Sequence, residues 1–217
     1  MPLWTPPPEW LGQDTILLGG GSSLTDYDFS RFKGRNTIGC NDAFRLGPEI
    51  IKICAFGDAS FFHHCKWELE KFSGKVVTCA PGLLNLKLSW LLQMKRLRDG
   101  LHSGSTIGWN YSTGAMAINL ALSLGANRIF LLGYDVGKRL DGKTHWHDYR
   151  HKLIQDETYR RFVRGFSCVH ASLKRFPEIQ VVNVTDGTSQ LPLFERITFE
   201  EFHTRCFPDL VRQEVAA

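Results

Sequence analysis

The sequence predicts an α/β fold in which a Rossmann-like parallel sheet carries helices on both faces. Short apolar segments alternate along the chain with segments of helical character. The apolar segments are continuous rather than alternating, which is typical of parallel strands buried on both sides. The 217 residues and the 43% hydrophobic content suit a single α/β domain over residues 1–217.

The first half of the chain is predicted to contain strands that end at glycine, proline or polar residues. Residues 1–13 are proline-rich and are expected to form an extended lead. Residues 58–72 are expected to form a helix that Asp58 could cap. The predicted strands of this half cover residues 15–20, 35–44, 50–58 and 75–81.

The second half is predicted to alternate helices with strands. Ser112 or Thr113 can cap the clearest helix and Gly125 can end it, whereas Gly165 marks a potential break in a longer one. Thr198 and the glutamate three residues later match a capping box. In order, the predicted elements are a helix over 112–126, a strand over 128–136, a polar loop over 137–152, a helix over 153–176, a strand over 179–185 and a helix over 198–207.

The charge of the chain is mildly basic, with a formal net charge of +4 at pH 7. This charge suits an anionic small ligand such as a nucleotide and is too small by itself to imply nucleic acid. The basic runs at Lys95–Arg98 and Arg160–Arg164 are expected to form solvated helix faces. They also leave open a nucleotide- or DNA-binding module without catalysis.

The six cysteines are widely spread and form no CxxC pair, so neither a zinc ribbon nor a disulfide framework is expected. The first residues do not resemble a secretory signal, and no apolar run reaches membrane-spanning length. These features predict a soluble cytoplasmic protein. Trp4 and Trp10 are expected to be exposed, where they could pack on a second copy, so a homo-oligomer stays an open alternative.

The predicted strand ends carry a polar and glycine-rich set of residues. Ligands of open parallel sheets bind beyond the carboxyl ends of the strands. Glycine lets a phosphate approach backbone N–H groups, Asn41 could contact a base or ribose, and Asp58 and Asp135 could hold a ribose hydroxyl or a metal ion. A plain tight turn and a helix cap remain the alternatives for the glycines and for Asp58. The candidate strand-end residues are Gly19, Gly20, Gly21, Ser22, Ser23, Asn41, Asp58 and Asp135.

The polar loop contains His145, His147 and His151 within seven residues. Histidine is the side chain best suited to proton transfer near neutral pH. Because the loop follows the strand that ends at Asp135, it is expected to lie over the same pocket. A general base or phosphate contact is the leading interpretation; a zinc site and a solvated loop are the alternatives, and no residue is assigned as a metal ligand.

Several motifs follow one another in a recognisable order between residues 15 and 190. They are GGGSSL followed by DYDFS, the pair Cys40–Asn41, the run STGAMAINLALSLGANRIFLLGYD and the loop HWHDYRH. This order resembles that of bacterial sialyltransferases that use CMP-sialic acid, and of the related 6-hydroxymethylpterin diphosphokinase-like domains. The resemblance implies a sialyltransferase-like fold.

The resemblance also implies a nucleotide-dependent transferase, with a glycosyltransferase that uses a nucleotide-sugar donor and a hydroxyl-bearing acceptor as the leading case. The turn over 19–23 and Asn41 would hold the nucleotide. Ser112, Thr113 and Gly114 would contact phosphate or sugar. A loop histidine, with His147 or His151 favoured over His145, would act as general base or acid. No cofactor is required in this case.

Two departures from the sialyltransferase pattern accompany the resemblance. Serine stands at position 22 in place of the usual proline, and Tyr149 is the only phenol near the loop, where those enzymes place tyrosines that assist the departing phosphate. The alternative activity is a Mg²⁺-dependent diphosphokinase acting on a hydroxymethyl acceptor, with Asp58 and Asp135 as the expected metal ligands. A modified nucleic acid as acceptor also stays open.

Overall fold

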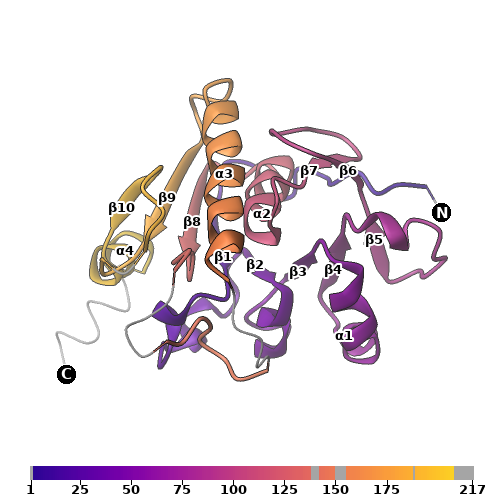
Figure 1. The fold of residues 1–217 in the computed structure, drawn as a ribbon, viewed down its shortest axis with the longest axis horizontal. Helices are drawn as coiled ribbons and strands as arrows, with labels where there is room; N and C mark the ends of the chain where they lie inside the picture. Colours follow the sequence, from indigo (N-terminus) through magenta and orange to yellow (C-terminus); the bar gives the residue numbers. More distant parts are fainter. Residues whose placement is uncertain (1, 138–141, 150–154, 188, 208–217) are drawn as a thin grey trace.

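An eight-stranded parallel sheet forms the centre of the protein (Figure 1). The computed structural model describes residues 2–137, 142–149, 155–187 and 189–207. The strands follow the order β10-β9-β8-β1-β2-β3-β4-β5, and every neighbouring pair is parallel. They are β1 (Asp14–Leu18), β2 (Thr37–Cys40), β3 (Ile53–Phe56), β4 (Lys75–Thr78), β5 (Leu91–Gln93), β8 (Arg128–Leu132), β9 (Gln180–Val184) and β10 (Glu195–Ile197).

Helices cover both faces of this sheet, as the sequence predicts. On one face, α2 (Thr113–Ser123) and α3 (Asp156–Leu173) lie side by side and bury the main apolar core (Figure 1). On the other face lie α1 (Ala59–Lys71), α4 (Phe199–Cys206) and the short 3₁₀ helices η1 (Ser22–Leu24), η2 (Phe29–Phe32), η3 (Asn41–Leu46) and η4 (Pro81–Leu83). Strand β1 serves both cores, because Leu17 packs on one side and Ile16 and Leu18 on the other.

The chain order creates a switch point at the centre of the sheet. From β1 the chain steps outward through β2, β3 and β4 to β5, and it then returns to place β8 on the opposite side of β1. Connections therefore leave β1 and β8 in opposite directions. Such a point opens a crevice at the carboxyl ends of the strands, which is where ligands of open α/β sheets bind.

Four short strands are absent from the sequence prediction: β5, β10 and the separate parallel pair β6 (Lys95–Leu97) and β7 (Thr106–Gly108). The run Lys95–Arg98 was expected on a helix face, but its first three residues form β6, paired with β7. Each of these strands has three residues. A stretch so short carries no readable periodicity, so its partner strand decides its conformation.

The start of the chain is packed against the protein, which corrects the expectation of exposed tryptophans. Residues 2–13 contain no helix or strand. Trp10 is buried at 5% exposure, and the amide of Trp4 donates to the carbonyl of Gln93 at the sheet edge. Among the described residues, no helix combines the length and the apolar character needed to cross a membrane.

The expected break at Gly165 does not occur, because α3 runs without interruption through this residue. A Cβ built on Gly165 would lie 1.8 Å from the carbonyl oxygen of Asn110. The glycine therefore serves a close approach between α3 and the loop before α2. Local sequence alone suggests a helix break, whereas the tertiary contact explains why this residue has no side chain.

We predict that Gly165→Ala lowers the free energy of unfolding by about 2 kcal/mol, although alanine is the better helix former. The reason is that the added methyl would meet backbone, which cannot rotate away. Urea unfolding with an unchanged m-value measures the effect. Ser167→Ala, at an exposed position of the same helix, is the control and should stay within about 0.5 kcal/mol of wild type. Equal stability of the two variants would contradict the proposed contact.

Candidate functional site

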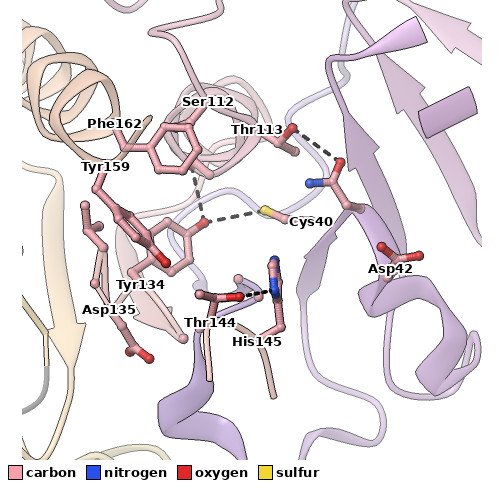
Figure 2. Close-up of a pocket in the computed structure, with 18 of the residues that line it drawn as sticks. Cys40, Asp42, Ser112, Thr113, Tyr134, Asp135, Thr144, His145, Tyr159 and Phe162 are labelled. Atoms are coloured by element: carbon pink, nitrogen blue, oxygen red, sulfur yellow. Dashed lines mark hydrogen bonds between the residues drawn. The ribbon is translucent and has the colours of Figure 1, made fainter. Parts of the chain in front are cut away.

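A solvent-open cavity with a water-accessible volume of about 160 Å³ lies at the carboxyl ends of β1, β2 and β8, against the first turn of α2 (Figure 2). Most of the residues singled out from the sequence meet here. Those that line the cavity are Gly19, Gly20, Gly21, Asn41, Ser112, Thr113, Gly114, Asp135, His145 and His147.

The other candidates lie elsewhere. Ser22 and Ser23 belong to the first turn but do not line the cavity. Asp58 is exposed at the N-cap position of α1, its side chain makes no capping hydrogen bond, and it does not line the cavity. His151 falls outside the described residues.

The glycines after β1 are required by protein atoms that cross close to them. A Cβ on Gly19 would lie 2.4 Å from the carbonyl oxygen of Gly133, and one on Gly21 would lie 2.6 Å from the Asp135 carboxylate. A Cβ on Gly20 would lie 3.0 Å from the ring of His145. The ends of β1 and β8 are therefore too close for side chains. Packing, rather than access for a phosphate, explains the glycines at 19 and 21.

This packing uses some of the amides of the turn and leaves others available. The amide of Gly19 donates to Leu132 and that of Gly21 to Gly133, each over 2.8 Å. The amide of Ser23 donates to the Asp135 carboxylate. Within the described part of the chain, the amides of Gly20 and Ser22 donate to no protein acceptor. The turn can therefore offer a ligand only part of its backbone donors.

Asp135 holds the turn in place with its carboxylate. Oδ2 accepts the amide of Ser23 at 2.7 Å and Oδ1 accepts its hydroxyl at 2.6 Å, across 112 residues of sequence. The side chain is buried at 4% exposure, and in Figure 2 its carboxylate points away from the hydroxyl of Tyr134. The next residue, Val136, has a positive φ of 50°, which is costly for a β-branched residue. The end of β8 is thus held in a strained conformation beside the cavity.

The first turn of α2 supplies further backbone donors. Ser112 caps the helix, because its hydroxyl accepts the amide of Ala115 at 3.1 Å. In the described structure the amides of Thr113 and Gly114 donate to no protein acceptor. The positive end of the helix dipole therefore faces the cavity with unused N–H groups, which is an arrangement that binds anions.

Asn41 and Thr113 meet between β2 and α2. The Thr113 hydroxyl donates to the Asn41 side-chain carbonyl over 3.4 Å. Asn41 adopts a left-handed φ of 53°, which asparagine tolerates better than most residues. The amide nitrogen of its side chain makes no hydrogen bond to the described protein and can donate to a ligand.

The wall beneath these groups is largely apolar. Tyr134 is buried, its hydroxyl donates to the Gly114 carbonyl over 3.3 Å, and the Cys40 sulfur lies 3.7 Å away. Burial raises the pKa of Tyr134 well above its usual value and that of the Cys40 thiol to about 12. Both groups therefore stay neutral at physiological pH. They form an uncharged floor that excludes water.

Tyr159 is a cavity residue that the sequence analysis missed. It extends from α3 with Phe162 and Phe166 along the same side of the cavity. Its hydroxyl is buried without a hydrogen-bond partner among the described residues, and in Figure 2 it points toward the cavity. Burial, followed by the charges of Asp135 and Asp156, raises the pKa of Tyr159 to about 12. The spacing of the three aromatic residues on one helix face is the signal that could have identified it.

Residues 142–149, here called the histidine flap, are fastened to the first turn by Trp146. Its amide donates to the Gly20 carbonyl over 3.1 Å and its indole Nε1 to the Gly19 carbonyl over 3.0 Å. The indole also packs on Phe29, with ring centroids 4.8 Å apart. These contacts hold the residues on either side of Trp146 against the cavity.

His145 and His147 are both half-buried residues of this flap. His145 Nδ1 lies 2.8 Å from the Thr144 hydroxyl, and its ring lies over Gly20. The His147 ring lies 5.3 Å from that of His145 and 5.0 Å from that of Tyr149, measured between centroids. Two imidazoles therefore stand together, and that of His145 lies beside Gly20, whose amide is available. Such a group can move a proton at a bound ligand.

Comparison with solved structures identifies the fold. The chain is similar to the sialyltransferase CstII from Campylobacter jejuni in complex with CMP, with 13% identity over 84% of each chain and a TM-score of 0.53. A complex of CstII with CMP-3FNeuAc matches at 13% identity and a TM-score of 0.50, over 84% of this chain and 85% of the other. A variant of the enzyme with CMP matches at 12% identity and a TM-score of 0.52, over 85% of this chain and 86% of the other. Neither a family model nor a curated protein matches. The chain thus has the sialyltransferase-like fold that the sequence motifs predicted.

We predict that Asp135→Asn lowers the free energy of unfolding by about 2 kcal/mol, because an amide cannot accept both hydrogen bonds from Ser23. Asp26→Asn makes the same chemical change at an exposed carboxylate in a left-handed position and should stay within about 0.5 kcal/mol of wild type. Chemical unfolding measures both. Similar losses in the two variants would show that Asp135 does not hold the turn.

Proposed function

We propose that the protein is a glycosyltransferase that binds a nucleotide-sugar donor in this cavity and transfers its sugar to a hydroxyl group. One observation carries the proposal: unused amides of the first turn and of α2 face a pair of histidines across a single cavity at the switch point of the sheet. The two sets of amides supply a binding site for a phosphate, and the histidines supply a proton carrier. These are the parts that a phosphate leaving group needs.

The structural neighbours suggest which nucleotide to test first. They are sialyltransferase structures in complex with CMP or with the substrate analogue CMP-3FNeuAc. Because the present chain shares their fold, a cytidine nucleotide is the first candidate for its donor. Fold similarity leaves the sugar and the acceptor open, so both follow from experiment.

The phosphate of the donor would lie between the two groups of available amides. The amide of Gly20 would donate from one side and those of Thr113 and Gly114 from the other. The dipole of α2 adds to the attraction. Asn41 stands beside Thr113, where its side chain would contact the ribose or the base. Backbone groups fixed in this way need no rearrangement when charge develops on the phosphate.

In the transfer step, the acceptor oxygen forms a bond to the anomeric carbon while the bond from that carbon to the phosphate oxygen breaks. The acceptor proton passes to a flap histidine, for which His147 is the first choice and His151 remains a sequence-based alternative. His145 lies over Gly20 and would stabilise the departing phosphate. The nucleoside monophosphate of a CMP-linked donor then leaves with the electron pair of the broken bond.

Tyr159 would assist the same departure. A pKa of about 12 keeps its phenol protonated at neutral pH, so it can donate a hydrogen bond but cannot act as a base. Its hydroxyl has no partner among the described residues, so a phosphate oxygen would satisfy it. The sequence motifs suggested that Tyr149 was the only phenol available for this role. Helix α3 supplies a second one from outside the loop.

The diphosphokinase alternative receives no support from the arrangement of carboxylates. It requires Asp58 and Asp135 at one Mg²⁺ site, but Asp58 does not line the cavity and Asp135 is engaged by Ser23. Among the described residues, no group of three histidine, cysteine or acidic side chains could hold a metal ion. The two carboxylates therefore do not fit the metal that this activity would use.

We expect CMP to stabilise the protein, by about 2.7 kcal/mol at a hundred times its dissociation constant. Thermal unfolding with CMP, UDP, GDP or ATP, each with and without Mg²⁺, measures this. Gly20→Ala should weaken the binding of CMP about tenfold, because the added methyl narrows the space for the phosphate. Gly82→Ala is the control, since its Cβ would make only ordinary contact at 3.7 Å. Stabilisation by none of the nucleotides would contradict the proposed function.

We further expect His147→Ala or His145→Ala to lower kcat for donor cleavage by about 10²- to 10⁴-fold while nucleotide affinity stays within about twofold. His147→Ala would remove the group that accepts the proton, and His145→Ala would remove a group that stabilises the phosphate as its charge develops. Neither change touches the backbone amides that would bind the phosphate. Release of the nucleotide from the sugar donor measures kcat. His170→Ala, on the exposed side of α3, serves as the control. Full turnover in both flap variants would refute the role of the flap.

A further inference from the structure

The two basic runs of the sequence meet at one aromatic residue. Arg98 follows β6 and donates from Nε to the Tyr111 hydroxyl over 2.9 Å. The guanidinium carbons of Arg98 and Arg164 lie 5.8 Å and 5.5 Å from the centroid of the Tyr111 ring. Arg98, Tyr111 and Arg164 are here called the arginine–tyrosine cluster. They come from three separate parts of the chain.

The cluster lies next to the candidate active site. Tyr111 directly precedes Ser112, the cap of α2 and a cavity residue. Arg164 belongs to the same part of α3 as Phe162 and Phe166, but it is two residues from each, so its side chain leaves the helix on the side opposite these two cavity residues. The cluster therefore occupies the surface where the first turn of α2 packs on α3. A substrate that extends from the cavity past Ser112 would reach Tyr111, and through it the two arginines.

The backbone beneath the cluster is strained and firmly held. Asn110 and Tyr111 have left-handed φ values of 47° and 61°. The Asn110 side chain exchanges hydrogen bonds with Gly100 at 2.7 and 2.9 Å, and its carbonyl packs against Gly165 of α3. A tyrosine in this conformation is uncommon, and such strain is concentrated at functional sites. The ring of Tyr111 is thereby fixed in advance between the two arginines.

The arginines keep most of their donors available. Arg164 is exposed and makes no ion pair or hydrogen bond within the described structure. The Arg98 side chain is 72% exposed, and its carboxylate contact in the described structure is Asp99, at 3.5 Å. An exposed contact between an arginine and an aromatic ring contributes little to the stability of a protein. Two guanidinium groups beside one fixed ring are better explained by an anionic ligand.

We propose that the arginine–tyrosine cluster binds the anionic group of a negatively charged carbohydrate acceptor. The inference rests on the proposed function and adds the charge of the acceptor to it. The tyrosine ring offers a flat face to a sugar, and the flanking guanidinium groups offer paired N–H donors to a carboxylate or phosphate.

A carbohydrate fits this surface better than a nucleic acid. Arg96, in the first basic run, turns inward, donates to the carbonyls of Gly57 and Cys79, and stacks on Trp109 at 4.2 Å. The run therefore does not form a continuous track for successive phosphates. One ring between two arginines instead matches one charged sugar unit.

Isothermal titration with defined saccharides tests the inference. The probes are a trisaccharide of galacturonic acid, a neutral galactose trisaccharide, glucose 6-phosphate with glucose as its neutral partner, a single-stranded DNA oligonucleotide, and CMP. The variants are Arg98→Gln with Arg164→Gln, Arg164→Gln alone, and the control pair Lys87→Gln with Lys174→Gln. The control removes the same charge from exposed lysines that lie outside the cluster. Arg164→Gln removes no hydrogen bond of the described protein.

We expect wild type to bind an anionic saccharide at least about tenfold more tightly than its neutral partner. The double arginine variant should lose this preference and Arg164→Gln should reduce it, whereas the lysine control should keep it. CMP affinity should stay within about twofold in all variants. Galacturonate and glucose 6-phosphate separate a carboxylate from a phosphate as the preferred group.

Loss of the preference in the lysine control, or no preference in wild type, would overturn the inference. Binding of DNA that depends on Arg98 and Arg164, without any saccharide preference, would also overturn it. If CMP binds but the saccharide preference is absent, the proposed function stands and only this inference fails. If CMP does not bind, the proposed function fails while the saccharide preference still reports on the cluster.

Discussion

The structure depends on the close crossing of the chain at the ends of β1 and β8. The two strands approach so closely that Gly19 and Gly21 have no room for a Cβ, and the buried Asp135 carboxylate takes both donors of Ser23. This carboxylate holds together two segments that are 112 residues apart. The crossing decides which amides of the turn form hydrogen bonds within the protein and where the 3₁₀ helix after the turn begins. It also decides which carbonyl groups accept hydrogen bonds from Trp146 of the histidine flap.

The same crossing separates structural polar groups from those that can serve a ligand. Asp135 and Ser112 have the residue types of ligand contacts, but one holds the turn and the other caps α2. The donors that stay available to an anion in the cavity are mostly backbone amides, those of Gly20 and of the first turn of α2. Backbone donors are fixed by the fold and do not depend on side-chain identity. This is consistent with a shared fold at 13% sequence identity to the sialyltransferase structures.

Helix α3 connects the cavity with the neighbouring surface. One side of the helix contributes Tyr159 and two phenylalanines to the cavity wall, while Arg164 on the other side lies against the ring of Tyr111. Gly165 lets the strained loop before α2 approach this helix, which fixes the position of Tyr111. The proposed donor site and the proposed acceptor contact therefore share one rigid support. Geometry fixed in this way can orient two substrates relative to each other.

The sequence by itself determined the parallel α/β class, the main strands and helices, and the strand ends where Gly20, Asn41 and the flap histidines lie. These features follow from local patterns of apolar residues, caps and glycines, which neighbouring residues decide. Only the tertiary structure decided that Asp135 holds a turn, that Asp58 lies outside the cavity, and that Tyr159 lines it. It also decided where the three-residue strands form, because pairing with a neighbouring strand sets their conformation. The physical reason is that contacts between distant segments determine whether a polar group is hydrogen-bonded within the protein or stays available to a ligand. No local sequence pattern indicates which of the two occurs.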